Sequence, residues 1–468
     1  MKRTIIFSLM LALAACNPVT QVLTVDGGRI QGVPTNSPGV IVYRGIPYAA
    51  PPVGELRWKA PQSVEPWEGV RVCDSWGAPS WQNPHTPGGY TDEFFADGDP
   101  AFSEDCLYLN VWTPAPGQRS RNLPVTLWIH GGGFVAGWGH EPEMDGESWA
   151  RHGGVLVTFN YRLGVLGFMS HPALSEESPD GVSGNYGLMD QIAALEWVKR
   201  NIAEFGGDPN HITVMGQSAG AKSVMNVVSS PLSRDLVAGA IIQSGGGISD
   251  KPILNAPTLE EAQAQWKEVM DWAGYTTLEQ MRAASPEDLL NINWKYAAET
   301  GAMPAGTRPV LDDYALEENF AEAVLAGHIA DVPYMIGGTL DDMAGLADGI
   351  DRFCLEREKA GTPAYAYQFA RRLPTDGRPD VLEGAFHSSE LWYMFNSLDL
   401  CWRPFTDGDY SLADEMITRW TNFAACGNPN GDGPETWTPC TAEDPSFMIF
   451  ALDGEDHPAC RMGAPLKE

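Results

Sequence analysis

A serine between two glycines gives the sequence its strongest chemical signal. The run Gly-Gln-Ser-Ala-Gly at 216–220 lies between an expected strand at 212–215 and an expected helix from Ala219 to about Val228. A serine on a tight turn from strand to helix has a strained backbone, and its hydroxyl projects from the sheet. The run alone could form an ordinary glycine turn, but the flanking strand and helix favour Ser218 as a nucleophile.

A second glycine-rich run offers donors for the negative charge that attack by a serine creates. His-Gly-Gly-Gly-Phe at 130–134 follows the strand expected at 125–129. Glycines without side chains let backbone N–H groups approach a tetrahedral intermediate closely. A flexible turn is the alternative interpretation. With Ser218 in the same chain, we expect an oxyanion hole made by the N–H groups of Gly132, Gly133 and Ala219.

A serine hydroxyl also needs a base near neutral pH. When the serine lies on this kind of turn, the orienting acid and then the histidine follow it along the chain. His328 precedes the strand expected at 332–336, and His457 lies in a polar turn near the end of the sequence. His387 is therefore the expected general base.

The orienting acid is expected just after the strand at 332–336. Gly-Gly-Thr-Leu follows that strand, and then come Asp341 and Asp342. A carboxylate past the C-terminal end of a strand lies at the edge of the sheet where the serine turn also lies. Either aspartate fits this position from the residues alone.

Short apolar runs alternate with helical patterns along the chain, and these elements must position the site. Several runs are almost continuously apolar, as in strands buried on both faces of a parallel sheet. The expected strands are 40–44, 125–129, 155–159, 212–215, 240–243, 332–336 and 365–369. Between them, apolar residues recur at helical spacing from Leu188 to Ile202. The sequence therefore predicts an α/β fold with a central, mostly parallel sheet flanked by helices.

Residues 258–326 are expected to be predominantly helical, with helices at 259–273, 277–283 and 317–325. They predict a helical cap or flank inserted into the α/β core. No linker-like tract or internal repeat interrupts the sequence. One α/β domain over 17–468 with helical insertions is the expected organisation.

Charge excludes some partners. The chain has 468 residues, with 30 basic and 61 acidic side chains and a formal charge of −31. Phosphate-rich partners would be repelled at long range, so neither nucleic acid nor an anionic lipid surface is the expected main partner.

The first residues resemble a targeting segment. Lys2 and Arg3 precede an apolar run at 5–15 that is too short to span a bilayer, and small residues then lead to Cys16. This pattern predicts a lipoprotein signal at 1–16 with lipidation of Cys16, and hence a periplasmic or cell-envelope location with membrane contact only through the lipid. An ordinary signal cleaved near Ala15, and a secreted protein, is the alternative.

Export makes disulfides plausible for the remaining seven cysteines. The preferred pairs are Cys73 with Cys106 and Cys440 with Cys460. The cysteine spacing is not that of a zinc site, and the expected chemistry requires no metal or organic cofactor.

These motifs together resemble the type-B carboxylesterases, the family of the cholinesterases and para-nitrobenzyl esterases, over about residues 22–450. The resemblance implies the α/β-hydrolase fold. The matching stretches are Arg-Gly-Ile-Pro-Tyr-Ala at 44–49, Ser-Glu-Asp-Cys-Leu-Tyr-Leu-Asn-Val at 103–111, His-Gly-Gly-Gly-Phe at 130–134, Asn-Tyr-Arg at 160–162, Gly-Asn-Tyr-Gly-Leu at 184–188, Asp-Gln at 190–191, Phe-Gly-Gly at 205–207, His-Ser-Ser-Glu-Leu at 387–391 and Gly-Asn-Pro-Asn at 427–430.

The resemblance implies roles for the same residues: Ser218 as nucleophile, His387 as general base and acid, and Gly132, Gly133 and Ala219 as the oxyanion hole. The family usually has glutamate as the acid. Asp342 aligns with that glutamate, its carboxylate reaches one methylene less far, and Asp341 is the minor alternative.

The sequence departs from the family elsewhere. Gln217 stands where many members have glutamate, which weakens any case for a cationic substrate. The family's disulfide partner of Cys106 aligns near Ser80 and not with Cys73. Only 45 residues separate Asp342 from His387, fewer than in most relatives, so we expect a shallower and more open site.

The sequence thus predicts a serine hydrolase that cleaves small-molecule or polymer-linked carboxylic esters through a covalent acyl-enzyme. Hydrolysis of amides or thioesters is one alternative, because the same residues can perform it. A non-catalytic recognition or adhesion module of the same fold is another.

Overall fold

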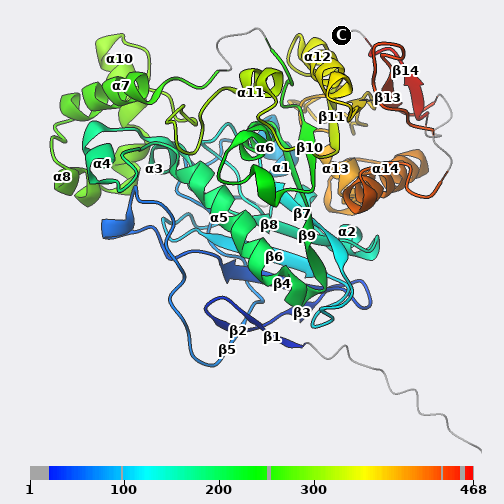
Figure 1. Cartoon of the computed structure of the whole chain (residues 1–468), viewed down its shortest axis with the longest axis horizontal. Coiled ribbons are helices and arrows are strands. Elements are labelled where there is room, and N and C mark those ends of the chain that lie inside the picture. Colours follow the sequence, from blue (N-terminus) through cyan, green and yellow to red (C-terminus); the bar gives the residue numbers. More distant parts are fainter. Residues whose placement is uncertain (1–20, 96–97, 250–254, 434–435, 454–458, 467–468) are drawn as a thin grey trace, which may run out of the picture.

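An eleven-stranded sheet forms the centre of the fold in the computed structural model, which describes residues 21–95, 98–249, 255–433, 436–453 and 459–466 (Figure 1). The predicted signal at 1–16, with Cys16, and the histidine His457 that the sequence excluded as the base lie outside these residues. The strand order is β14-β13-β12-β11-β10-β9-β7-β8-β6-β4-β3. The strands from β13 to β8 are parallel to one another, and antiparallel strands flank them on both sides. The mostly parallel sheet and the α/β-hydrolase fold are therefore confirmed.

The strands of this sheet are β3 (Val33–Pro34), β4 (Ile41–Pro47), β6 (Tyr108–Thr113), β7 (Leu123–Ile129), β8 (Val155–Phe159), β9 (Gly207–Gln217), β10 (Gly239–Gln243), β11 (Tyr334–Thr339), β12 (Tyr365–Phe369), β13 (Phe447–Phe450) and β14 (Arg461–Gly463). A second, small sheet contains β1 (Val22–Val25), β2 (Gly28–Gln31) and β5 (Val70–Val72).

The α-helices are α1 (Tyr90–Phe94), α2 (Glu147–Arg151), α3 (Gly164–Phe168), α4 (Pro172–Glu177), α5 (Tyr186–Asn201), α6 (Ala219–Ser229), α7 (Leu259–Trp272), α8 (Leu278–Ala283), α9 (Pro286–Leu290), α10 (Ile292–Thr300), α11 (Phe320–Ala326), α12 (Leu346–Lys359), α13 (Leu391–Met394) and α14 (Asp407–Cys426). None of the helices in the described part of the chain has the length and apolar character that crossing a membrane requires.

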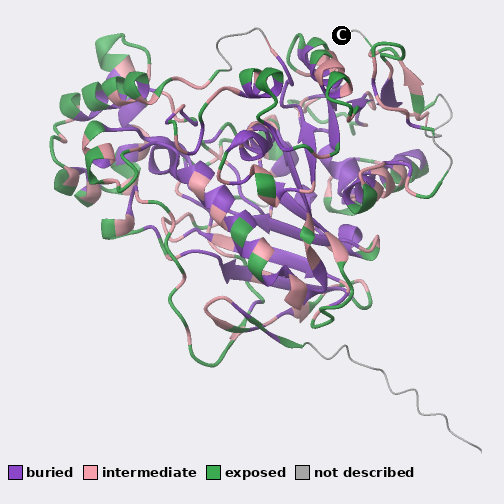
Figure 2. Ribbon diagram, in the orientation of Figure 1, coloured by how far each residue is buried: buried purple, intermediate pink, exposed green. Residues whose placement is uncertain are grey.

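Alternating side chains divide the core into two layers. On β7, Val125 and Leu127 belong to one apolar cluster and Trp128 to the other, because successive strand residues face opposite sides of a sheet. Helices α5, α6, α11 and α12 cover the first face. Helices α2, α13 and α14 cover the second face, and both layers are buried (Figure 2). The sheet is therefore held rigidly from both sides at the level where the site lies.

The amphipathic helix predicted near 188–202 is confirmed. It forms α5, and its apolar stripe from Leu188 to Val198 is buried against the sheet. After a short 3₁₀ turn, Gly206 adopts the left-handed conformation with φ 83° and ends the helical stretch. Strand β9 then begins at once, so α5 delivers the chain directly to the strand that precedes Ser218.

The helical insertion is only partly as expected. Helices α7 to α10 pack with α3 and α4 around a separate apolar cluster at one end of the molecule (Figure 1). No helix forms at 301–319, although the sequence analysis expected 258–326 to be predominantly helical. Pro304 and Pro309 lie in this stretch and cannot donate the hydrogen bonds of a helix interior. The extended segment that results borders a cavity beside the candidate site.

Candidate active site

Ser218 occupies a strained turn between β9 and α6. Its φ is 59° and its ψ is −122°, a conformation that costs a residue with a side chain on the order of 1–3 kcal/mol. The backbone N–H of Ser218 donates to the carbonyl of Gln243 at 2.9 Å, at the end of the neighbouring strand β10. The surrounding sheet thus holds the strained serine at the C-terminal edge of the parallel strands.

The glycines on either side of Ser218 are required by packing. A Cβ atom on Gly216 would lie 2.5 Å from the carbonyl oxygen of Gly220, and a Cβ on Gly220 would lie 2.0 Å from that of Ile129. Both neighbours are backbone atoms, which cannot rotate away. Only glycine at 216 and 220 lets α6 start this close to β7 and β9.

The glycine run after β7 lies against the serine turn. A Cβ on Gly131 would be 3.2 Å from Cβ of Ser218. Gly132 and Gly133 have φ values of 94° and 64°, and in the part of the chain that the structure describes neither N–H has a protein acceptor. Ala219 is the first residue of α6, so its N–H has no partner within the helix. The three N–H groups predicted for an oxyanion hole therefore flank the serine turn.

His387 and Asp342 form a hydrogen-bonded pair. Nδ1 of His387 lies 2.9 Å from Oδ1 of Asp342, although 45 residues separate them in the chain. Ser244 Oγ, after β10, donates to the other carboxylate oxygen at 2.6 Å. The Asp342 side chain is only 2% exposed, whereas that of His387 is 26% exposed. The pair thus combines a buried carboxylate with an imidazole that solvent and substrate can reach.

Asp341 has different partners. Its carboxylate accepts a hydrogen bond from the backbone N–H of Ala385 at 2.8 Å and lies 3.7 Å from the guanidinium of Arg372. Of the two aspartates that the sequence left open, Asp342 is the one in contact with His387.

The contact between His387 and Asp342 shifts the pKa values of both side chains. Burial lowers the pKa of His387, but the hydrogen bond and negative charge of Asp342 outweigh burial and raise that pKa above its usual value. Burial raises the pKa of Asp342, but His387 and the hydroxyl of Ser244 outweigh burial and lower it. The arrangement favours a proton on His387 whenever another group releases one nearby.

Two residues near His387 have positions that the sequence analysis did not foresee. The amide nitrogen of Gln217 lies 3.2 Å from Nε2 of His387, so the ring edge opposite Asp342 faces the serine turn. Glu390 is fully buried, and burial, reinforced by the charge of Asp342, raises its pKa to about 7. Glu390 is part of the stretch at 387–391, but only the fold reveals that its carboxylate is buried beside the pair.

Several other charged or polar residues, most of them in the motif stretches, form buried contacts away from Ser218. Arg162 pairs with Asp190 at 2.7 Å, and both side chains are buried. Arg57 pairs with Glu104 at 2.5 Å. His130 is fully buried, and burial lowers its pKa to about 3, so it remains neutral. Arg162 also donates to the carbonyl of Lys59, and Arg57 to that of Ala284, so the two ion pairs connect segments that lie far apart in the chain.

The predicted disulfides are wrong for the described structure. All seven cysteines beyond Cys16 are free thiols, so neither Cys73 and Cys106 nor Cys440 and Cys460 are bonded. Ser80, near which the resemblance aligns the family's disulfide partner, hydrogen-bonds the thiol of Cys106. Spacing along the chain could not show which cysteines the fold brings together.

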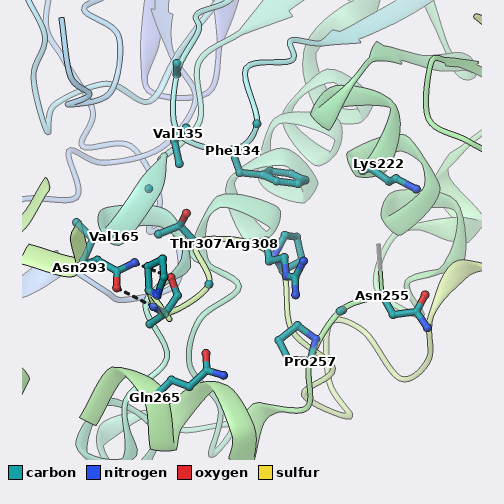
Figure 3. Close-up of a pocket in the computed structure, with 18 of the residues that line it drawn as sticks. Phe134, Val135, Val165, Lys222, Asn255, Pro257, Gln265, Asn293, Thr307 and Arg308 are labelled. Carbon is teal, nitrogen blue, oxygen red and sulfur yellow. Dashed lines mark hydrogen bonds between the residues drawn. The ribbon is translucent and has the colours of Figure 1, made fainter. Parts of the chain in front are cut away.

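A cavity of about 780 Å³ opens beside the oxyanion loop (Figure 3). Gly133 and Phe134 line it on one side, and Trp266 on α7 and Leu289 on α9 line it on another. Its volume is in the range of ordinary small-molecule sites. The helical insertion thus supplies part of the wall of a substrate-sized space next to the oxyanion loop.

Comparison with known proteins gives the same assignment. The model of the carboxylesterase family matches residues 19–352 and 347–462. The chain is 33% identical to fumonisin B1 esterase of Sphingopyxis macrogoltabida, over 88% of this chain and 83% of that protein. It is 32% identical to para-nitrobenzyl esterase of Bacillus subtilis, over 88% and 91%. Among solved structures, a thermophilic PNB esterase superposes with a TM-score of 0.78 at 28% identity, covering 95% of this chain and 98% of that one.

A serine turn flanked by backbone N–H groups, a histidine–aspartate pair facing it and a substrate-sized cavity agree with these matches. The chain belongs to the carboxylesterase family and is a carboxylic ester hydrolase.

Proposed function

We propose that this esterase works through a covalent acyl-enzyme on Ser218, with His387 as general base and acid and Asp342 as the carboxylate that orients it. One observation carries the proposal. Asp342 holds Nδ1 of His387 at 2.9 Å, and the opposite ring nitrogen faces the turn that bears Ser218. A base fixed by a carboxylate on one side and presented to a serine on the other is the arrangement that activates a hydroxyl.

In the first half-reaction, Ser218 Oγ attacks the ester carbonyl carbon, and Nε2 of His387 takes the hydroxyl proton. The carbonyl π electrons move to oxygen, and the N–H groups of Gly132, Gly133 and Ala219 stabilise the resulting oxyanion. One donor of this kind contributes on the order of 10²–10³ in kcat. When the tetrahedral intermediate collapses, the C–O bond to the alcohol breaks, and the imidazolium returns its proton to the alkoxide.

In the second half-reaction, water replaces the alcohol. His387 takes a proton from the water as its oxygen attacks the acyl carbon, and the same donors stabilise the second oxyanion. Collapse breaks the bond to Ser218 Oγ, which regains its proton from His387. The enzyme returns to its starting state and the products are one alcohol and one carboxylic acid.

Hydrolysis of p-nitrophenyl acetate by the Ser218→Ala variant tests this mechanism. We expect kcat to fall by at least about 10³-fold, because the residual rate comes only from binding and the oxyanion donors. Ser229→Ala is the matched control, since Ser229 lies on the same helix α6 and hydrogen-bonds only Met225 within it. A Ser218→Ala variant that folds and keeps most of its activity would refute the mechanism.

The substrate class follows from the accessibility of the site. Gly132 and Gly133 are exposed, and Ser218 is partly exposed. We propose an open site that accepts small-molecule esters and ester groups on polymers. Comparing the rate of hydrolysis of soluble triacetin with that of an insoluble polyester film tests whether the enzyme accepts ester groups on polymers.

The mature chain is proposed to be a single domain over 17–468 that a lipid on Cys16 anchors to the cell envelope. The eleven-stranded sheet draws strands from Val33 to Gly463, which supports one domain. The positive, apolar and small-residue segments before Cys16 support lipidation. Labelled palmitate should enter the protein in cells and should be lost in Cys16→Ala. A wild-type chain that remains unlabelled and soluble would favour secretion.

A further inference from the structure

The cavity beside the oxyanion loop differs in charge from the rest of the molecule. The chain carries a formal charge of −31. Among the described residues that line the cavity there is no aspartate or glutamate, whereas Lys222, Arg308 and His85 all contribute to its wall. Figure 3 shows Lys222 and Arg308 together with Phe134 around the cavity. With 61 acidic residues in the chain, composition alone would place some carboxylates on the wall of so large a cavity. Their absence from the described lining therefore needs another explanation.

Lys222 lies one helical turn beyond the nucleophile. Its backbone N–H donates to the carbonyl of Ser218 at 3.0 Å, and its Nζ lies near Gly246, where an added Cβ would be 3.8 Å away. In the described part of the chain, no carboxylate is within ion-pair distance of this ammonium group. Burial lowers its pKa to about 8. Lys222 is half-buried, and a partly desolvated cation gains when a ligand supplies a negative charge.

Arg308 lies on the extended segment between α10 and α11, and side-chain hydrogen bonds hold the backbone on either side of this residue. Asn293 forms two hydrogen bonds to the backbone of Ala305, at 2.6 and 2.7 Å, which Figure 3 shows as dashed lines. On the other side, Asn185 forms two to the backbone of Val310, both 2.9 Å. A segment fixed at both ends presents its guanidinium with little loss of entropy on binding.

From these contacts we infer that Lys222 and Arg308 recognise an ionised carboxylate on the substrate, so that the preferred esters carry a free acid group in addition to the ester bond. The inference rests on the proposed function of Ser218, because it places the acid group in the cavity that adjoins the Gly133 donor. Arginine carries five N–H donors, so its guanidinium can contact a carboxylate in addition to a protein partner, and lysine adds a point charge. Phe134, Val165 and Trp266 line the same space and accommodate the apolar part of the ester.

The test compares two esters that differ in one charge. Monoethyl glutarate carries a carboxylate where diethyl glutarate carries a second ester, and proton release during hydrolysis of either can be followed by pH-stat titration. We expect the ratio of kcat/KM for the monoester to that for the diester to fall about 10- to 100-fold in the double variant Lys222→Met, Arg308→Gln, as for loss of charged hydrogen bonds.

Lys295→Met is the matched control, because Lys295 is exposed on α10 and does not line the cavity. It removes one positive charge outside the cavity and should leave the ratio unchanged. A ratio that stays within twofold of wild type in a folded double variant would overturn the inference. If neither ester were hydrolysed by the wild-type enzyme while p-nitrophenyl acetate was, the carboxylate preference would be wrong and the Ser218 mechanism would stand. If the wild-type enzyme hydrolysed none of the three esters, namely monoethyl glutarate, diethyl glutarate and p-nitrophenyl acetate, the Ser218 mechanism itself would be contradicted.

A second measurement on the wild-type enzyme does not depend on the folding of variants. Glutarate should inhibit hydrolysis of p-nitrophenyl acetate competitively, at a concentration at least about tenfold below that needed for the uncharged glutaramide. Equal inhibition by the two compounds would contradict carboxylate recognition. A second pair of esters then locates the acid group. In monoethyl glutarate the carboxylate is on the acyl part, whereas in the butanoate ester of 4-hydroxybutanoic acid it is on the alcohol part, and butyl butanoate is the uncharged counterpart of that ester.

Discussion

The amide nitrogen of Gln217 lies 3.2 Å from Nε2 of His387. An amide nitrogen can only donate, so Nε2 accepts and the ring proton lies on Nδ1, facing Asp342. This is the tautomer that a general base for Ser218 requires. Because the amide is neutral, Gln217 holds the ring in place without adding a negative charge next to it.

Replacing Gln217 by glutamate should make His387 more basic. A carboxylate this close to an imidazolium raises its pKa by about one unit or more. His387 would then stay protonated to higher pH, and the acidic limb of the pH dependence of kcat/KM should move up by about one pH unit. Profiles with p-nitrophenyl acetate measure the shift. Gln217→Met, which adds no charge, should leave the limb where it is, and an unmoved limb in Gln217→Glu would show that the two side chains do not interact in solution.

The two neighbouring aspartates should respond differently to removal of their charge. In Asp342→Asn, the contact at Nδ1 no longer stabilises the imidazolium, and kcat should fall by about 10³- to 10⁴-fold. In Asp341→Asn, only the contacts to Ala385 and Arg372 change, so we expect less than about a tenfold effect. Steady-state measurement of kcat in both variants shows which aspartate matters. A larger loss of kcat in Asp341→Asn than in Asp342→Asn would show that Asp341, and not Asp342, orients His387.

Glu390 should make stability depend on pH. Its pKa in the folded protein is about 7, raised above the usual value of 4.5 by burial. The folded state therefore holds this proton more tightly than the unfolded chain. The stabilisation is complete below about pH 4 and is lost as pH rises through 7. Two and a half pKa units correspond to about 3 kcal/mol.

Urea unfolding of wild type and Glu390→Gln at pH 5 and pH 8 measures this loss. The variant should lose about 2.5 kcal/mol less than wild type between the two values, because part of the stabilisation has already gone at pH 5. Other buried acids, such as Glu141 and Glu143, titrate in both proteins, so the difference isolates Glu390. Equal losses in the two proteins would mean that Glu390 is already ionised in the folded state at pH 5.

Gly220→Ala should disturb the serine turn. The new methyl would lie 2.0 Å from the carbonyl oxygen of Ile129, so α6 must move away from β7. We expect a loss of about 1–3 kcal/mol in the free energy of unfolding and a large loss of kcat. Gly463→Ala is the control, because no atom lies within 4 Å of its added Cβ. Normal stability and activity in Gly220→Ala would show that the turn is looser than its contacts indicate.

The sequence predicted the parallel core well, because those strands are apolar on both faces. Strand β6 was missed because it contains Asn110, a residue uncommon in strand interiors. The structure explains the exception. The side-chain amide of Asn110 bonds the N–H of Gly45 at 3.0 Å and the hydroxyl of Thr158 at 3.1 Å, where β4 has an irregular register. An asparagine can be assigned to a strand interior only when its hydrogen-bond partners on the two adjacent strands, here β4 and β8, are known.

The site shows the same limit. Motif order placed Ser218, His387 and one of two aspartates, but the choice of Asp342 depends on how the chain turns after β11, where Asp341 instead meets Ala385. The cysteine pairs failed because pairing depends on three-dimensional proximity. Lys222 and Arg308 form no motif, and only the cavity brings them together.

The most direct test of the central claim is to treat the enzyme with diethyl p-nitrophenyl phosphate and locate the phosphoryl group by peptide mass spectrometry. We expect one phosphoryl group per chain, on Ser218, with esterase activity lost in proportion to labelling. Full labelling of another residue, or full activity after Ser218 is labelled, would contradict it.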